Sequence, residues 1–205
     1  MSGLFISFEG IDGVGKSTQA DLLEKYLLGQ GKTVLRTLEP GGTEVGVEIR
    51  KILLHHRGEL APRAEAALFA ADRAHHVASK IRPALERGEI VITDRYFDSS
   101  VAYQGAGREL SMEEVRNLSL WAVGGLLPDL TVLLDLPADV ARSRRNKTGT
   151  EPDRLESEKI EFFERARQAY LGLAENEPER FLVVDAATDV EKMQEIIRAR
   201  VSGLI

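Results

Sequence analysis

Residues 10–17 of the chain read GIDGVGKS, which matches the spacing G-x-x-x-x-G-K-S. Glycines at these positions allow backbone angles that turn successive amide N–H groups toward one concavity, where they bind an anion. The lysine supplies a positive charge for the β- and γ-phosphates of a nucleotide, and the serine hydroxyl can bind Mg²⁺. The pattern predicts an ATP-phosphate site formed by Gly10, Ile11, Asp12, Gly13, Val14, Gly15, Lys16, Ser17 and Thr18.

The surroundings of this loop support a phosphate-binding role. By chance alone, the pattern arises in roughly one chain in a hundred of this size. Here an apolar, strand-like segment precedes the loop and an amphipathic helical segment follows it. A strand before and a helix after are what a phosphate-binding loop requires.

A second pair of candidate residues, Asp94 and Arg95, follows the apolar segment 90–93. Asp94 can hold Mg²⁺ or a metal-bound water, so Ser17 and Asp94 are the candidate metal ligands. Arg95 can grip a phosphate group with its forked donors. The alternative for Asp94 and Arg95 is a surface ion pair that closes a strand.

A third candidate region is the polar, basic stretch at residues 142–152, which contains Arg142, Arg144, Arg145 and Lys147. We expect it to be a loop between two helices. One interpretation is a solvated connection. The other is a lid, at about residues 142–153, that closes over ATP and excludes water from the reaction.

Alternating strands and helices position these groups. Apolar and β-branched runs predict strands at residues 4–8, 33–38, 90–93, 131–134 and 181–184. We expect helices at residues 16–28, 45–55, 62–86, 111–123, 138–145, 156–174 and 190–201. The pattern indicates a three-layer α/β/α fold with a five-stranded parallel sheet buried on both faces. Right-handed crossovers would then gather the functional loops at the carboxyl ends of the strands.

Composition limits the possible functions. The 205 residues suit a single domain with a small lid, and 43% of them are hydrophobic. The net charge of −6 argues against a nucleic-acid-binding surface. There are no cysteines, and the four histidines stand in adjacent pairs that do not suit a zinc site. The uncharged stretch 118–128 is too short for a membrane span. We see no signal peptide and expect a cytoplasmic protein.

The class of phosphate-loop protein is narrowed by what accompanies the loop. A GTPase switch would need an N-K-x-D guanine reader, whereas the chain has NKTG at residues 146–149. A small kinase would need a second phosphate clamp for its acceptor and a lid. Asp94, Arg95 and the basic stretch meet that description.

Five ordered segments resemble bacterial thymidylate kinases, and together they cover nearly the whole chain. They are FEGIDGVGKSTQ at residues 8–19, EPGGT at 39–43 continuing to the IR at 49–50, LFAADR at 68–73, DRY at 94–96 continuing to AYQG at 102–105, and DRLE at 153–156 with Phe162 and Tyr170 following. The resemblance implies transfer of the γ-phosphoryl group of ATP to dTMP, with Mg²⁺, in a homodimer. No nucleic acid or membrane partner is implied.

The resemblance also implies roles for particular residues. Phe69 would stack on the thymine ring, and Arg73, one helical turn later on the same face, would donate to its O4. The dTMP site would consist of Asp12, Glu39, Arg50, Phe69, Arg73, Arg95, Ser99, Ser100, Tyr103 and Gln104.

The catalytic residues implied are Lys16, Asp12, Arg95, Arg144 and Arg145. Eukaryotic relatives carry an arginine in the phosphate loop, where this chain has Gly13 and Val14, so the basic stretch should supply the closing charge. Two alternatives stay open. One is another small nucleotide kinase, acting on deoxynucleosides, cytidylate or adenylate. The other is a regulatory ATPase without a small acceptor.

Overall fold

The computed structural model describes residues 3–56, 58–147, 149 and 151–205. Within these residues, one sheet has five strands in the order β2-β3-β1-β4-β5, and every pair is parallel. The strands are β1 Leu4–Glu9, β2 Val34–Leu38, β3 Ile90–Asp94, β4 Leu130–Asp135 and β5 Phe181–Asp185. The predicted parallel sheet is confirmed, and each strand lies within two residues of its predicted bounds.

The central strand β1 is enclosed by apolar residues of the strands on both sides of it. Ile6 pairs with Ile92 of β3 on one side and with Leu130 of β4 on the other. All three side chains are buried. Helices cover both faces of the sheet, so residues on both faces of β1 are buried.

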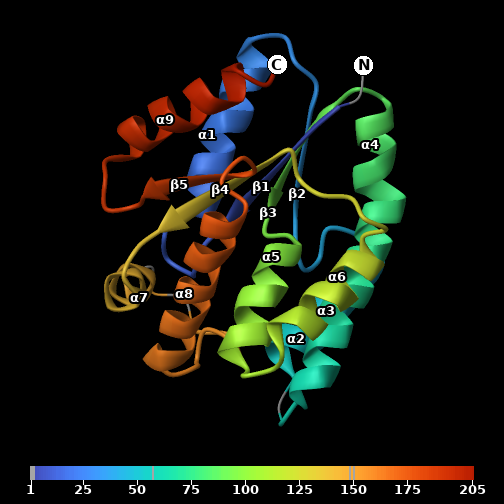
Figure 1. Ribbon diagram of the computed structural model, residues 1–205, viewed down its shortest axis with the longest axis vertical. Coiled ribbons are helices and arrows are strands. Elements are labelled where there is room, and N and C mark those ends of the chain that lie inside the picture. Colours follow the sequence, from blue (N-terminus) through green and yellow to red (C-terminus); the bar gives the residue numbers. More distant parts are fainter. Residues whose placement is uncertain (1–2, 57, 148, 150) are drawn as a thin grey trace.

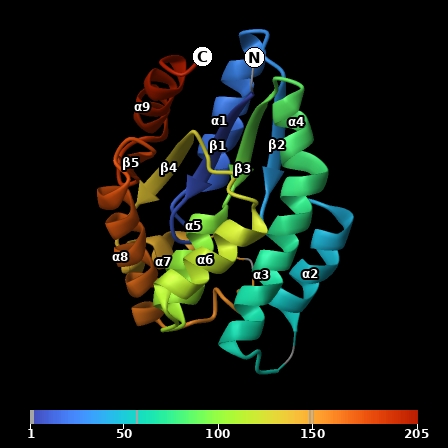
Figure 2. The same cartoon turned by 45° about the vertical axis from the view of Figure 1, so that its right-hand side comes forward.

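Helices flank the sheet in two layers (Figures 1 and 2). Helices α1 and α9 pack against each other on one face, and α4, α5 and α8 lie on the other. The helices are α1 Lys16–Gly29, α2 Glu44–His55, α3 Pro62–His76, α4 Arg82–Glu86, α5 Phe97–Ser100, α6 Met112–Ala122, α7 Ala138–Asn146, α8 Ile160–Asn176 and α9 Val190–Ser202. None of the helices in the described residues combines the length and apolar character that a membrane span requires.

The helix predicted at residues 62–86 is one rod with a wider turn inside it. Helix α3 continues through the π-helical segment η1, Val77–Ile81, into α4. Pro83 lies at the start of α4. A proline has no backbone N–H to donate to the preceding turn, and a locally wider turn accommodates its ring.

The segment after β3 is helical, which the sequence did not predict. Helix α5 runs directly into the π-helical segment η2, Val101–Gly107. Ser99, Ser100, Gly105 and Gly107 are poor helix formers, and nearly every residue from Phe97 to Gly107 is buried, so no amphipathic period marks the helix.

The basic stretch is also more helical than we expected. Helix α7 confirms the helix predicted at residues 138–145 and ends one residue later, at Asn146. Arg142, Arg144 and Arg145 therefore lie on this helix and not in the loop that we expected at residues 142–152. It lies beyond the carboxyl end of β4 (Figure 1). Positions 148 and 150 of the predicted lid fall outside the described residues.

Candidate active site

The loop between β1 and α1 has the geometry that its glycines predict. Gly13 has a φ of +89°, and a Cβ atom there would lie 2.2 Å from the carbonyl oxygen of Ala141 on α7. Only glycine allows this close approach of the loop to α7. The Nζ atom of Lys16 donates to the carbonyl oxygens of Gly10 and Ile11 at 3.0 and 2.9 Å. These bonds hold the lysine side chain along the loop.

The two predicted metal ligands lie side by side. Asp94 ends β3, and the hydroxyl of Ser17 at the start of α1 donates to its Oδ2 at 2.7 Å. A hydroxyl beside a carboxylate offers the oxygen donors that Mg²⁺ prefers. No group of three or more histidine or carboxylate side chains placed for a metal occurs in the part of the chain that the structure describes. A metal here would therefore take its remaining ligands from phosphates and water.

A cavity of about 390 Å³ opens above the phosphate loop. Its walls are Asp12, Gly13, Gly15, Lys16, Ser17, Thr18, Leu38, Glu39, Arg50, Asp94, Arg95 and Glu156. Ile11 and Val14, which the motif also covers, are buried in the hydrophobic core and anchor the loop.

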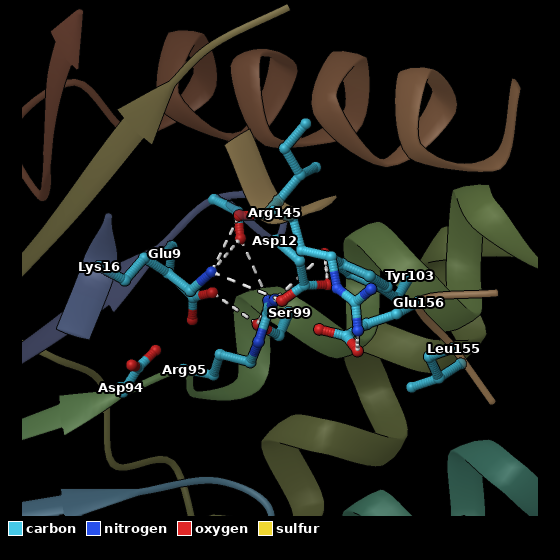
Figure 3. Close-up of polar contacts among 12 residues, drawn as sticks. Glu9, Asp12, Lys16, Asp94, Arg95, Ser99, Tyr103, Arg145, Leu155 and Glu156 are labelled. Carbon is cyan, nitrogen blue, oxygen red and sulfur yellow. Dashed lines mark hydrogen bonds and ion pairs between the residues drawn. The ribbon is translucent and has the colours of Figure 1, made fainter. Parts of the chain in front are cut away.

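Arg95 is the centre of a polar cluster beside this cavity (Figure 3). Its φ of 69° is unusual for a residue with a side chain. Nη2 donates to Asp12 Oδ1 at 2.5 Å and to the Tyr103 hydroxyl at 3.1 Å, while Nη1 donates to Ser99 Oγ at 3.1 Å. The Tyr103 hydroxyl in turn donates to Asp12 Oδ2 at 3.1 Å. The cluster fixes the position of the guanidinium.

The charges of this cluster control the protonation of Asp12 and Lys16. Burial alone would raise the pKa of Asp12, but the positive charges of Arg95 and Lys16 bring it down to about 2. Burial lowers the pKa of Lys16, and repulsion from Arg95 lowers it further, while Asp12 acts in the opposite direction. Asp12 is therefore a carboxylate at neutral pH and a poor proton acceptor.

Glu9 is an acidic residue whose place in the site the sequence did not reveal. It ends β1 and is fully buried. Its carboxylate accepts from the backbone N–H of Tyr96, from Ser99 Oγ and from the Tyr170 hydroxyl at 2.7, 2.6 and 2.8 Å. Burial and the negative charge of Asp98 raise the pKa of Glu9 to about 7. Through Ser99, this carboxylate supports the residues that hold Arg95.

A second cavity, of about 140 Å³, lies next to the first. Eight of the predicted acceptor-site residues line it: Asp12, Glu39, Arg50, Phe69, Arg95, Ser99, Tyr103 and Gln104. Pro40, Leu54, Asp153, Leu155 and Glu156 line it too. Asp153, Leu155 and Glu156 belong to the DRLE segment, for which the sequence predicted no individual roles. Leu54 lies at the end of an ordinary amphipathic helix, and nothing in the sequence marks it as a site residue.

The predicted base reader Arg73 lies behind this cavity. It is 1% exposed, and its donors reach Glu39 Oε2 at 2.6 Å, Ser100 Oγ at 3.0 Å and the Tyr96 carbonyl oxygen at 3.1 Å. Glu39 Oε1 also bonds His76 Nδ1 at 2.9 Å. Arg73 and Ser100 are not among the cavity walls, while Glu39, which holds Arg73, is one of them.

The structure separates the two lid arginines. Nη1 of Arg144 donates to the carbonyl oxygen of Ala186 after β5 at 2.7 Å, and Arg144 lines neither of the two cavities. Nη2 of Arg145 donates to Glu156 Oε2 at 2.5 Å, and Glu156 lines both. Arg145 thus lies closer to the candidate site than Arg144.

The two cavities meet at shared walls. Within the described residues, both are lined by Asp12, Glu39, Arg50, Arg95 and Glu156. Two arginines thus stand where a phosphate in one cavity would face a phosphate in the other. Such an arrangement suits transfer of a phosphoryl group between two ligands, with charge neutralised at the junction.

Comparison with known proteins identifies the family. The thymidylate kinase family model matches residues 8–197. The chain is 64% identical to the thymidylate kinase of Leifsonia xyli subsp. xyli over 203 residues, covering 99% of this chain and 96% of that protein. Identity to the thymidylate kinase of Clavibacter michiganensis subsp. michiganensis is 62% over 205 residues (100% and 97%), and to that of Kosmotoga olearia 47% over 192 residues (94% and 92%). The chain therefore belongs to the thymidylate kinase family.

Proposed function

We propose that the chain transfers the γ-phosphoryl group of ATP to dTMP at the junction of the two cavities. An oxygen of the dTMP phosphate attacks the γ-phosphorus, the bond to the β–γ bridging oxygen breaks, and ADP and dTDP leave. The observation that carries this assignment is the shared wall, where Arg50 and Arg95 face both cavities. The family membership and the loop geometry support it.

On the donor side, the phosphate loop and Lys16 hold the β- and γ-phosphates of ATP. The backbone N–H groups at the start of α1 supply further donors. Ser17 and Asp94 are suited to hold Mg²⁺, because their side-chain oxygens lie 2.7 Å apart at the cavity wall. When bound, the metal neutralises and orients the phosphates.

On the acceptor side, Phe69 lies along the cavity where a thymine ring would stack, with Gln104 at the edge of that ring. Tyr103 lies beneath the sugar, and Arg50 and Arg95 hold the 5′-phosphate. Arg73 donates to O4 of the base once dTMP is bound; its guanidinium lies next to the cavity wall, where Ser100 and Glu39 fix it.

The chemistry needs no general base. The attacking phosphate oxygen is already anionic at neutral pH, and Asp12, with its pKa near 2, is a poor proton acceptor. Asp12 instead orients Arg95 and the sugar. Catalysis then rests on positioning and on charge neutralisation by Lys16, Arg95 and a lid arginine. Of the two predicted lid arginines, the contact of Arg145 with Glu156 favours Arg145.

We further propose a cytoplasmic homodimer with a lid at about residues 142–153. Exposed apolar side chains support self-association: Trp121 on α6 is 80% exposed, and Val45 and Ile52 on α2 are also exposed. Sedimentation velocity tests the dimer, with Trp121→Ser expected to weaken it. A wild-type monomer at micromolar concentration would contradict it.

The experiment that tests the proposed function is formation of ADP with a panel of acceptors. We expect rapid turnover with dTMP and Mg²⁺, and much slower turnover with dCMP, AMP or a deoxynucleoside. Faster turnover with one of those acceptors would assign the chain a different nucleotide kinase activity. ATP hydrolysis indifferent to every acceptor would favour a regulatory ATPase.

A further inference from the structure

Glu65 is a buried carboxylate to which neither the phosphate loop nor the acceptor cavity gives a role. It lies in the first turn of α3 and is 0% exposed. Within the described residues, four hydrogen bonds reach it. Oε1 accepts from Gln104 Nε2 at 2.9 Å and from Arg108 Nε at 3.1 Å, while Oε2 accepts from Arg108 Nη2 at 3.1 Å and from Arg154 Nη2 at 2.6 Å.

These donors come from segments that are distant in the sequence. Gln104 belongs to η2 and is a wall of the acceptor cavity. Arg154 lies between Asp153 and Leu155, which are also walls of that cavity. Phe69, the candidate stacking residue, follows Glu65 by four positions and thus lies on the same face of α3. One carboxylate therefore joins three parts of the acceptor wall.

The cluster is anchored on its outer side as well. Arg108 also donates to Glu158 Oε1 through Nη1. Arg154 donates through Nε to the Leu53 carbonyl oxygen at 2.8 Å, and its backbone N–H donates to the Leu54 carbonyl oxygen at 3.1 Å. Leu54 is itself a wall of the acceptor cavity.

The charge on Glu65 is what holds this arrangement together. Burial would raise its pKa, but the hydrogen bonds from Arg108 and Gln104 lower it, so the group is ionised at neutral pH. Within the described residues, removing the charge would leave the largely buried Arg154 without its carboxylate partner and Arg108 with Glu158 alone. An uncompensated buried charge is costly, so Arg154 and the segment that carries it would move.

We propose that Glu65 is a positioning residue for phosphoryl transfer, which fixes Gln104 and the segment 153–156 as walls of the acceptor cavity. The same segment carries Glu156, the partner of Arg145 on α7. Glu65 thereby fixes the position of the acceptor wall. Through the same segment it also fixes the position of the Glu156 carboxylate, which contacts α7. This inference rests on the proposed function, since it takes the second cavity as the dTMP site.

The test is Glu65→Gln, which keeps the shape of the side chain and removes its charge. We expect kcat/KM for dTMP to fall by roughly tenfold to a hundredfold, because displaced walls misplace the acceptor. The KM for ATP should stay within about twofold, since Glu65 does not line the phosphate-loop cavity. A merely structural role would lower Tm and leave these kinetic constants unchanged.

A matched control and a second variant accompany the first. Glu177 also accepts hydrogen bonds from two arginines, Arg116 and Arg180, but lines neither cavity. Glu177→Gln should keep wild-type kinetics. Arg154→Gln removes the other half of the ion pair and decides the question if Glu65→Gln does not fold. In a double-mutant cycle, the two losses should overlap. The kcat/KM for dTMP of the double variant should therefore be at most about twofold below that of the less active single variant.

The outcomes are distinct. Folded Glu65→Gln and Arg154→Gln proteins with wild-type kcat/KM for dTMP would overturn the inference, as would losses that simply multiply in the double variant. In both cases the wild-type enzyme would still make dTDP, so the proposed function would stand. A wild-type protein that makes no dTDP would instead overturn the proposed function, and this inference with it.

Discussion

The buried carboxylate of Glu9 makes a sharp prediction about stability and pH. Glu9 is fully buried at the end of β1 and accepts three hydrogen bonds from Tyr96, Ser99 and Tyr170. Those bonds favour the ionised form, yet burial outweighs them and raises the pKa to about 7 from an ordinary 4.5. We predict that Glu9→Gln stabilises the protein at pH 8 and changes little at pH 5.

The sign follows from proton binding in the two states. Between pH 4.5 and 7 the folded protein keeps the Glu9 proton while the unfolded chain loses it, so the contribution of Glu9 to the unfolding free energy falls as pH rises. Raising the pKa from 4.5 to about 7, at 1.36 kcal/mol for each step of 1 in pKa, corresponds to about 3 kcal/mol lost between those pH values. Glutamine cannot ionise, and its amide can donate to the Ser99 and Tyr170 hydroxyls, so the variant should lack this loss.

The assay is urea denaturation at several pH values from 5 to 8, followed by circular dichroism. The informative quantity is the difference in unfolding free energy between wild type and variant, since other titrating groups cancel in it. Glu48→Gln, which removes an exposed carboxylate from α2, controls for the change in net charge. A Glu9→Gln difference that stays constant across the pH range would refute the reasoning.

The remaining predictions concern catalysis. Lys16→Ala should reduce kcat by about a hundredfold or more without unfolding the protein, as measured by coupled ADP assay and circular dichroism; near-normal turnover would contradict the phosphate-loop assignment. Arg145→Ala should lower kcat at least about tenfold and barely change the KM for dTMP. Arg144→Ala should lower kcat less, because the guanidinium of Arg144 bonds the Ala186 backbone. Equal losses of kcat in the two variants would contradict this distinction. Arg73 has only donors, which oppose the 4-amino group of cytosine, so kcat/KM for dCMP should be about tenfold to a hundredfold below that for dTMP, and dUMP should lose less. Equal values for dCMP and dTMP would indicate a broader pyrimidine kinase.

The fold was predictable because it depends on strong, local patterns. The five strands are apolar runs buried on both faces, and such runs stand out in any sequence. Boundaries were less certain: the helix expected from residue 156 begins at Ile160. The segment Phe97–Gly107 was missed because its helix is buried on nearly all sides and rich in serine and glycine. The helix predicted at residues 138–145 is confirmed as α7, but the loop expected from residue 142 overlapped it, because the polar, basic residues there are typical of a loop.

The site was predictable where one segment carries the chemistry and less so where distant segments meet. The phosphate loop is contiguous, and Asp94 was placed beside Ser17 by the rule that parallel strands end at one edge. The hydrogen-bond partners of Glu9 lie 87 to 161 positions away in the sequence. Those of Glu65 lie 39 to 89 positions away. A single acidic residue in a strand or helix gives no sign of such distant partners. Their roles depend on tertiary packing, which only the structure shows.

The paired charges at the junction also explain how an acidic protein can bind two anions and release them. Arg95 bonds Asp12, and Arg145 bonds Glu156. A phosphate that binds either arginine must compete with a carboxylate, which is also negatively charged. The exchange replaces one ion pair by another, so its net free energy is small compared with pairing a phosphate to an arginine that has no partner. Because the pKa of Asp12 is near 2, this competition persists throughout the physiological pH range. The site can therefore hold substrates in register and still release dTDP and ADP at each turnover.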